Sequence, residues 1–456
     1  MRRVFVVEIN WSFGLIIVCS LVLHACSILW LNLRKLRRKL SEQGITGLPP
    51  TLLYGNAAEM RSIAAGCEPE LLPRGQVSHD WAYSILPYLH HWAHHYGLLY
   101  MHSKRQKLNS YVNRPDLRRF LNLHKPFDSD KSTGQNWASH RKLIASQFFL
   151  VKVKGMMDLM VDSTMTLIEK WESMILESDG MFAHMYIHED LNSLSANVIA
   201  RACFGSSYLE GEQFAKLRTL RYALSKPDQL ISLFAVFSLF LPSKVNRDLW
   251  QIREEVDSLI LKVVRARQEE NRSSLKPEKD QLQTILESAD VDDAMNEKAC
   301  FSFVVDPCKN IYFSGQEMTA TTISWSMMQL ALHPEWQDRI RAEIAEFCGD
   351  RLCHRGSLDF ETLRKLKVRT MVIQETLHLY HPAIILVKET MTEIKLGEID
   401  VPEGAILWTL TPLGHRDPEK WGPAAKELKP ERFKDGVSEG CKHPQAYVPF
   451  GYASRL

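Results

Sequence analysis

The sequence predicts a mainly α-helical fold with small β-sheets, an α+β arrangement. Apolar residues recur at steps of three and four, the spacing of amphipathic helices, in residues 155–176, 251–268, 301–333 and 335–347. Short alternating stretches come late, at residues 393–410, where Gly397, Pro402 and Gly404 mark turns between strands. With 456 residues, 45% hydrophobic and 24% charged, the chain has enough apolar side chains for a sizeable core.

The charge and cysteine content exclude several classes of protein. Lys and Arg total 56 against 54 Asp and Glu, so the formal net charge is only +2 and no global field predicts binding to nucleic acid. The nine cysteines form no CxxC pair, which favours reduced thiols over a disulfide framework. Cys348 and Cys353 are close in sequence but lack a second pair, so they indicate a surface loop rather than a metal site.

The first 33 residues contain a candidate membrane anchor. Residues 11–33 carry no formal charge over 23 positions, and a helix rising about 1.5 Å per residue would span a hydrocarbon core of roughly 30 Å. A cleaved signal peptide is the alternative, although no small-residue cleavage site follows the run. Basic residues cluster at 34–39, so we expect residues 1–10 in the lumen and the rest on the cytosolic side.

A basic, proline-containing segment at residues 34–56 separates the anchor from the body. The prolines in GLPPTLLYGN, residues 47–56, fix backbone dihedrals and remove amide donors, which is typical of a stiff hinge or of a plain linker. Residues 57–456 show no internal repeat and no second-domain boundary, so we expect one domain there. Residues 269–279 are polar and predict a surface loop between helices.

Two groups of residues within 57–456 have candidate chemical roles. Trp137 and Arg141 are four residues apart, so on a helix they could offer an indole N–H and a guanidinium to one carboxylate, or form a surface stack. Gly315 stands in mid-helix, where glycine costs roughly 1 kcal/mol relative to alanine and often marks a close approach of a flat ligand or a bend. Glu317 beside it is either part of that site or a solvated carboxylate.

A second group of motifs follows in the last quarter of the chain. QETLHLYHPA places Glu375 and His378 on one helical face, and LKPERF supplies Arg432. HRDPEKWG, residues 415–422, is a polar turn between apolar runs. The final VPFGYASRL, residues 448–456, predicts a tight loop that presents backbone amides and a cation.

In order along one chain, these motifs resemble a plant cytochrome P450 monooxygenase. The resemblance rests on the anchor, the proline hinge, WxxxR, the Gly-Glu pair in a long helix, ExxH before LYHP, HRDPxxWG, PERF and PFGYASR, and it covers essentially the whole chain. LHHWAHHYG, ARACFGSSY and CKNIYFSGQE look like the branch that includes gibberellin-oxidising enzymes.

The resemblance implies the cofactor, partners and location. The family holds haem b through a cysteine thiolate, which favours O–O cleavage. It implies a single-pass protein of the endoplasmic reticulum membrane, electrons from NADPH-cytochrome P450 reductase and a hydrophobic small-molecule substrate, here a gibberellin-type diterpenoid.

The resemblance also assigns roles residue by residue. Trp137 and Arg141 would hold one haem propionate, Arg455 the other, with Lys388 in place of a family arginine. The remaining roles are catalytic for Glu317 and Thr319, cofactor-binding for Phe450 and Gly451, and structural for the network of Glu375, His378 and Arg432.

The iron ligand is the largest departure from the family pattern. The glycine loop should lead into the ligating cysteine directly after Leu456, where the sequence stops. Cys441 precedes that loop, and none of the nine cysteines is a credible replacement, so we expect no metal ligand in these residues. The alternative to an enzyme is therefore a truncated, catalytically inactive relic that is a membrane-anchored protein.

Further departures lie elsewhere in the chain. Ala453 replaces a glycine, Met318 replaces an alcohol that follows the helix acid, and His378 replaces the arginine of ExxR. Pro307 is expected to enter the start of the long helix and remove an amide donor, and residues 124–137 are shorter than the family's segment over the substrate.

Overall fold

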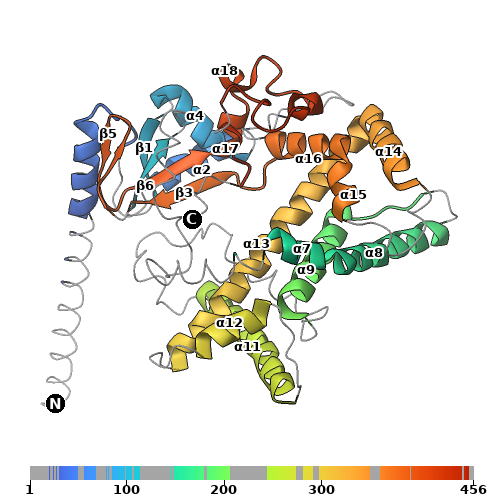
Figure 1. Ribbon diagram of the computed structural model, residues 1–456. Helices are drawn as coiled ribbons and strands as arrows, with labels where there is room; N and C mark the ends of the chain where they lie inside the picture. The colour runs from blue at the N-terminus through green and yellow to red at the C-terminus, as the bar shows by residue number, and fades with distance from the viewer. Residues whose placement is uncertain are drawn as a thin grey trace, which may run out of the picture.

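The fold was analysed in a computed structural model of the chain. The described residues are 30–49, 56–67, 85–97, 99–104, 107–112, 148–178, 182–205, 244–273, 281–290, 297–349, 360–390, 392–443 and 446–450, with the single positions 20, 24, 27, 79, 81 and 145. Helices dominate these residues, and two small sheets lie toward one end, beside the N-terminal helical segment (Figure 1).

The described helices agree with the predicted helical class. They are α2 (Ala57–Gly66), α4 (Pro87–Tyr96), α7 (Leu150–Gly155), α8 (Met157–Glu177), α9 (Ile187–Phe204), α11 (Lys244–Ser273), α12 (Gln281–Asp290), α13 (Glu297–Leu332), α14 (Pro334–Cys348), α15 (Phe360–Lys365), α16 (Lys367–Leu379), α17 (Thr411–His415), α18 (Pro418–Trp421) and the 3₁₀ turn η4 (Pro430–Phe433). The four segments predicted from periodicity correspond to α8, α11, α13 and α14. Pro334 occupies the first turn of α14, where a missing N–H costs no helix bond.

Two predicted boundaries are wrong. The long helix α13 begins at Glu297, so Pro307 lies inside it rather than at its start, and one internal amide bond is lost. The polar stretch predicted as a loop from residue 269 continues α11 as far as Ser273. Exposed polar side chains are compatible with a solvated helix end, and polarity alone therefore placed the boundary too early.

In the described part of the chain, six strands form two sheets. The larger sheet has the order β1-β2-β6-β3, from β1 (Leu99–Lys104), β2 (Lys107–Val112), β3 (Ile385–Glu389) and β6 (Ile406–Leu410). β1 and β2 form an antiparallel hairpin, β2 and β6 are parallel, and β3 and β6 are antiparallel. The smaller sheet pairs β4 (Ile394–Leu396) with β5 (Ile399–Val401). The predicted late strands are confirmed, whereas the early hairpin was not predicted.

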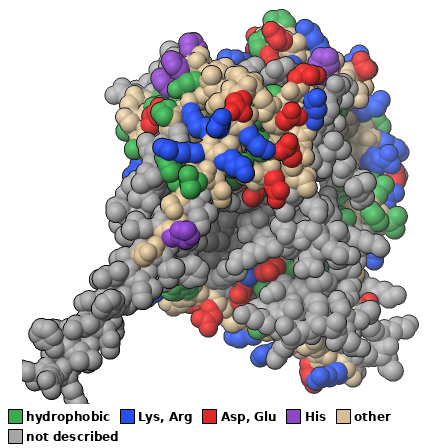
Figure 2. Space-filling model, turned by 90° about the vertical axis from the view of Figure 1, so that its left-hand side faces the viewer, with side chains coloured by type: hydrophobic (Ala, Val, Ile, Leu, Met, Phe, Trp, Pro, Cys, Tyr) green, Lys and Arg blue, Asp and Glu red, His purple; other side chains and the backbone are tan. Residues whose placement is uncertain are grey.

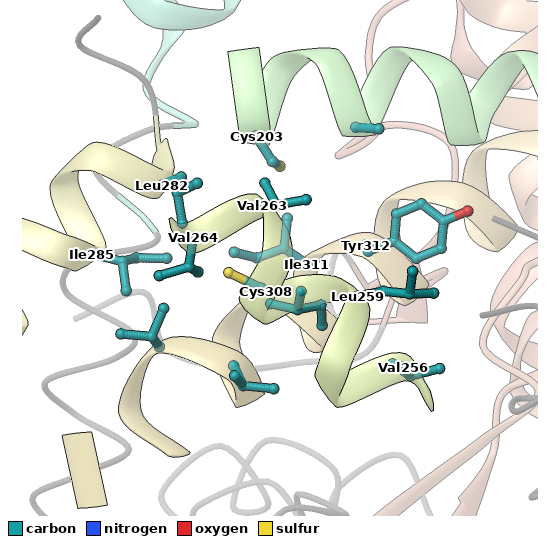
Figure 3. Packing of buried hydrophobic residues seen from close by; sticks show 14 of the residues in the cluster. Cys203, Val256, Leu259, Val263, Val264, Leu282, Ile285, Cys308, Ile311 and Tyr312 are labelled. Carbon is teal, nitrogen blue, oxygen red and sulfur yellow. The ribbon is translucent and has the colours of Figure 1, made fainter. Parts of the chain in front are cut away.

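The largest core cluster joins four helices. Buried side chains from α9, α11, α12 and α13 meet in one apolar interior, including Cys203, Val263, Leu282, Ile285 and Ile311 (Figure 3). α13 crosses the molecule diagonally, and its N-terminal half packs in this cluster while its C-terminal half reaches α14 and α16 (Figure 1). This helix thereby connects the helical core to the elements around α16.

The N-terminal helical segment, residues 30–41, packs on the small sheet. Its inner side buries Leu33 and Leu40, and Figure 2 shows Lys and Arg side chains gathered on the outer face, where Arg34, Lys35 and Arg38 are exposed. The predicted anchor 11–33 lies mostly outside the described residues. Among the helices that are described, none has both the length and the apolarity to cross a bilayer.

The segment predicted as a hinge is paired with the sheet at its start. Leu48 N–H donates to Met101 O at 3.0 Å, and Met101 N–H donates to Thr46 O at 2.9 Å. A Cβ atom at Gly47 would overlap main-chain atoms of Met101. The Arg37 guanidinium donates to the carbonyls of Gly47 and Leu48. The segment at Gly47 is therefore bonded both to the Met101 backbone of β1 and to the N-terminal helical segment.

Candidate active site

The centre of the candidate site is a buried carboxylate on α16. Glu375 is fully buried, and it accepts hydrogen bonds from Lys429 N–H at 2.8 Å and from Arg432 Nε at 2.9 Å. Burial opposes ionisation, but the neighbouring His378, the charge of Arg432 and the Lys429 N–H together lower the pKa of Glu375. The residue is therefore a carboxylate at neutral pH.

Arg432 connects this carboxylate to the loop between α18 and η4. Its Nη2 donates to Ala424 O at 2.7 Å, while its Nε bonds the carboxylate. The side chain is 7% exposed, so the charge pair with Glu375 is largely removed from water. A planar guanidinium can make these bonds at once because its N–H groups point in fixed directions.

His378 lies one turn after Glu375, as the three-residue spacing predicts. Its Nδ1 is 3.4 Å from Glu375 Oε2, and its Nε2 donates to His415 O at 2.6 Å. His415 Nδ1 donates back to His378 O at 3.0 Å, so its Nε2 is free of a proton in the neutral ring and accepts Val448 N–H at 2.9 Å. The network thus extends from α16 through α17 to the segment before Phe450.

Aromatic rings enclose these polar groups. The Trp421 ring centre is 3.9 Å from that of His378, and the Tyr447 ring stacks on His415 at 5.8 Å. Trp421 is 5% exposed, and its Nε1 donates to Gly414 O at 3.2 Å. The low polarity around the network strengthens its hydrogen bonds and makes each unpaired member costly.

The predicted residues of α13 do not share one side of the helix. Glu317 is half-buried, whereas Thr319 is exposed and borders a cavity that Glu317 does not line. Residues two apart on a helix differ by about 200°, so the pair cannot act on one atom. A Cβ at Gly315 would lie 2.6 Å from Ile199 Cδ1, so the close approach that this glycine permits is that of α9.

The cavity beside Thr319 has a volume of about 450 Å³. Its lining comes from α13, α14 and α16 together with Phe450, which is 57% exposed. Met318, Thr322 and Ser326 line it at four-residue steps, which is the spacing of a helix-packing surface. We assign this cavity no part in substrate binding.

None of the described cysteines is placed to offer a thiolate beside the segment that ends at Phe450. Cys441 donates its S–H to His443 O at 3.1 Å, and burial raises the pKa of its thiol. Cys203 and Cys308 are buried in the helical core, and Cys308 lies nine residues before Glu317, about 13.5 Å along the helix axis. Cys348 is buried at the end of α14, so the surface loop predicted for it is wrong at this position, and Cys353 lies outside the described residues. Cys67 is exposed after α2.

Lys388 lies on β3, opposite Leu407 of β6, and is half-buried. Burial lowers the pKa of Lys388 from 10.5 to about 8. Between about pH 8 and pH 10.5 the Lys388 ammonium group is protonated in the unfolded chain but has lost its proton in the folded chain. The free energy of unfolding should therefore increase with pH across this range.

Lys388→Met is expected to abolish this rise. Urea midpoints measured from pH 7 to pH 10 should show the variant more stable than wild type at pH 7, with the gap closing as pH increases. Lys395→Met, at an exposed position of β4, is the matched control and should leave the profile unchanged. A difference in urea midpoint between Lys388→Met and wild type that is the same at every pH would contradict the lowered pKa of Lys388.

Several candidate residues fall outside the described part of the chain. These are Trp137, Arg141, Gly451, Ala453 and Arg455, as well as the short segment at residues 124–137. Their predicted contacts with haem propionates and their effect on substrate access remain predictions.

Two members of the network were not predicted. His415 and Trp421 lie in HRDPEKWG, which the sequence marked only as a polar turn. A histidine and a tryptophan flanking a short turn between apolar runs are the available signal, because both side chains need hydrogen-bond partners when buried. Only the fold identifies those partners, which are His378 O and Val448 N–H for His415 and Gly414 O for Trp421.

A cytochrome P450 family model matches residues 94–455. The chain is 38% identical to cytochrome P450 714A2 of Arabidopsis thaliana over 479 aligned positions, covering 99% of this chain and 89% of that protein. It is also 38% identical to cytochrome P450 714C2 of Oryza sativa subsp. japonica, covering 96% of this chain and 87% of that protein.

The structure of retinoic acid-bound cyanobacterial CYP120A1 is similar in fold. The two superpose with a TM-score of 0.63 over 79% of this chain and 80% of that chain, at 20% sequence identity. At this identity the likeness concerns the fold alone.

Proposed function

The chain belongs to the cytochrome P450 family, and from that premise we propose that it serves as a haem-thiolate monooxygenase acting on a hydrophobic small molecule. The observation that carries the proposal is the buried network of Glu375, His378 and Arg432, which reaches Val448 N–H. It fixes the segment that precedes the glycine loop against α16 and α17. The chain therefore leaves this segment for the glycine loop from a fixed position.

The described residues do not supply the thiolate that the family's cofactor requires. Haem with a cysteine thiolate ligand supplies the electron density that favours O–O cleavage. None of the described cysteines fits that ligand, because Cys441 is a buried thiol with a raised pKa and the others lie in the core, at the end of α14 or after α2. The expected sulfur donor is therefore the cysteine that the family places directly after Leu456.

The other residues have roles that do not depend on that ligand. Glu317 is the proposed proton donor of α13, because its carboxyl group is half-buried and Thr319 lies on a different side. Lys388 is proposed to pair with a propionate, since an anion beside it would raise the pKa that burial lowers to about 8. Trp137, Arg141 and Arg455 complete the proposed propionate contacts.

We propose a gibberellin-type diterpenoid as the substrate. The proposal is supported by the 38% identity to cytochrome P450 714A2 and by LHHWAHHYG, ARACFGSSY and CKNIYFSGQE, the stretches that resemble gibberellin-oxidising enzymes. The predicted anchor, endoplasmic reticulum location and reductase partner belong to the same proposal.

The test uses the chain extended after Leu456 by a cysteine-led C-terminal segment taken from cytochrome P450 714A2. Microsomes containing this protein and a plant reductase are expected to convert a gibberellin-type diterpenoid into a product one oxygen atom heavier, dependent on NADPH and O2. Serine in place of the leading cysteine is the matched control and should give no product. A correct haem-thiolate spectrum without any diterpenoid product would reject the substrate class, and absence of both would favour the inactive relic.

A further inference from the structure

Helix α4 has four histidines in its ten residues, PYLHHWAHHY. Leu89 and Trp92 point into the core at 0% and 1% exposure, which fixes the orientation of the helix. His91 and His95 are both exposed. Because they are four residues apart, they lie side by side on one face of the helix.

The histidines face a pocket next to the end of α2. The pocket has a volume of about 380 Å³, and its lining includes His90, His91, His94, His95 and Cys67. α2 and α4 lie against one another beside the larger sheet (Figure 1). The lining contains imidazole and thiol donors and no carboxylate, a donor set that suits Zn²⁺ or Cu²⁺ rather than Mg²⁺ or Ca²⁺.

We propose that His91 and His95 form a binding site for a divalent transition-metal ion, with Zn²⁺ as the probe. Two histidines at this spacing on a helix are an established zinc-binding arrangement. No trio of His, Cys, Asp or Glu converges on one point within the described ranges, so the protein supplies two nitrogens and water completes the coordination.

The position on the helix supports a cation. His95 lies in the last turn of α4, where unpaired carbonyl groups give the helix end a partial negative charge. Gly97 N–H donates to Ala93 O at 2.9 Å, which closes the turn that carries His95. Imidazole binds metal in its neutral form, and binding should therefore weaken on acidification.

The experiment is a calorimetric titration of the 456-residue protein, purified without a polyhistidine tag, with Zn²⁺ and separately with Mg²⁺. Removal of even an outer partner of a metal ligand weakens binding about 10- to 100-fold, so His91→Ala/His95→Ala should lower the Zn²⁺ affinity of this site by more than about tenfold. Mg²⁺ should give no binding heat in either protein.

The matched control is His184→Ala/His188→Ala. These two exposed histidines are also four apart, but His184 precedes α9, which begins at Ile187, so they do not share a helical face. The control should bind Zn²⁺ as wild type does. Unchanged affinity in His91→Ala/His95→Ala, or an equal loss in both double variants, would overturn the proposal. Circular dichroism of each variant checks that the loss does not come from unfolding.

Discussion

Replacing Glu375 by glutamine is expected to lower the free energy of unfolding by about 3–5 kcal/mol, because it leaves the buried Arg432 charge without its partner. The amide can still accept the Lys429 N–H, so the loss reports mainly the charge pair. Urea denaturation at pH 7 measures it. The lowered pKa of Glu375 means that wild-type stability from this carboxylate is present above about pH 4.5 and lost as pH falls, and the variant should lack that dependence.

The matched control for this change is Glu431→Gln. Glu431 pairs with Arg339 at 2.7 Å, a comparable distance, but both side chains are 46% exposed. Exposed ion pairs contribute about 0.2–1 kcal/mol, so this variant should be nearly as stable as wild type. If the two variants lose the same amount, burial of the α16 pair is not what makes it strong.

Gly47→Ala is expected to lower the free energy of unfolding by about 3 kcal/mol. The added methyl group would overlap main-chain atoms of Met101, which cannot relieve the overlap by changing rotamer as a side chain can. Relief requires breaking the hydrogen bonds that Leu48 N–H and Met101 N–H make across the bridge, and each buried group left unpaired costs about 1–3 kcal/mol. Urea denaturation gives the total loss, and hydrogen exchange at these two amides locates it.

Gly44→Ala is the control that distinguishes backbone strain from overlap with neighbouring atoms. Gly44 has φ of +82° and no atom within 4 Å of an added Cβ, so only the left-handed conformation is penalised, by about 1–2 kcal/mol. The Leu48 and Met101 amides should keep their protection in this variant. Faster exchange there in Gly44→Ala than in Gly47→Ala would contradict the packing argument.

The long helices could be predicted from sequence because their apolar spacing is locally complete. α14 shows this most clearly, since Pro334 marks its first turn and Trp336 and Cys348 lie on its buried side. The hairpin of β1 and β2 could not be predicted in this way. The consecutive residues Tyr100, Met101 and His102 are all buried. The alternation of apolar and polar residues that indicates a half-buried strand is therefore missing.

The candidate site was predictable only where its members are close in sequence. Three-residue spacing brings Glu375 and His378 to one face of α16, and the fold then adds Arg432 from 57 residues away. The bond from Val448 N–H to His415 spans 33 residues and depends on how α17 packs. Local spacing carries no information about such pairs, which explains why His415 was not identified as a member of the network.

We infer that the network of Glu375, His378, Arg432 and His415 holds the segment that ends at Phe450, while none of the described cysteines supplies the iron ligand. The most direct test is the absorption spectrum of the haem-supplemented 456-residue chain after reduction under carbon monoxide, beside the chain extended by a cysteine-led segment after Leu456. We expect a thiolate-type Soret band from the extended chain alone. A thiolate-type band from the unextended chain that disappears in Cys441→Ser would contradict it.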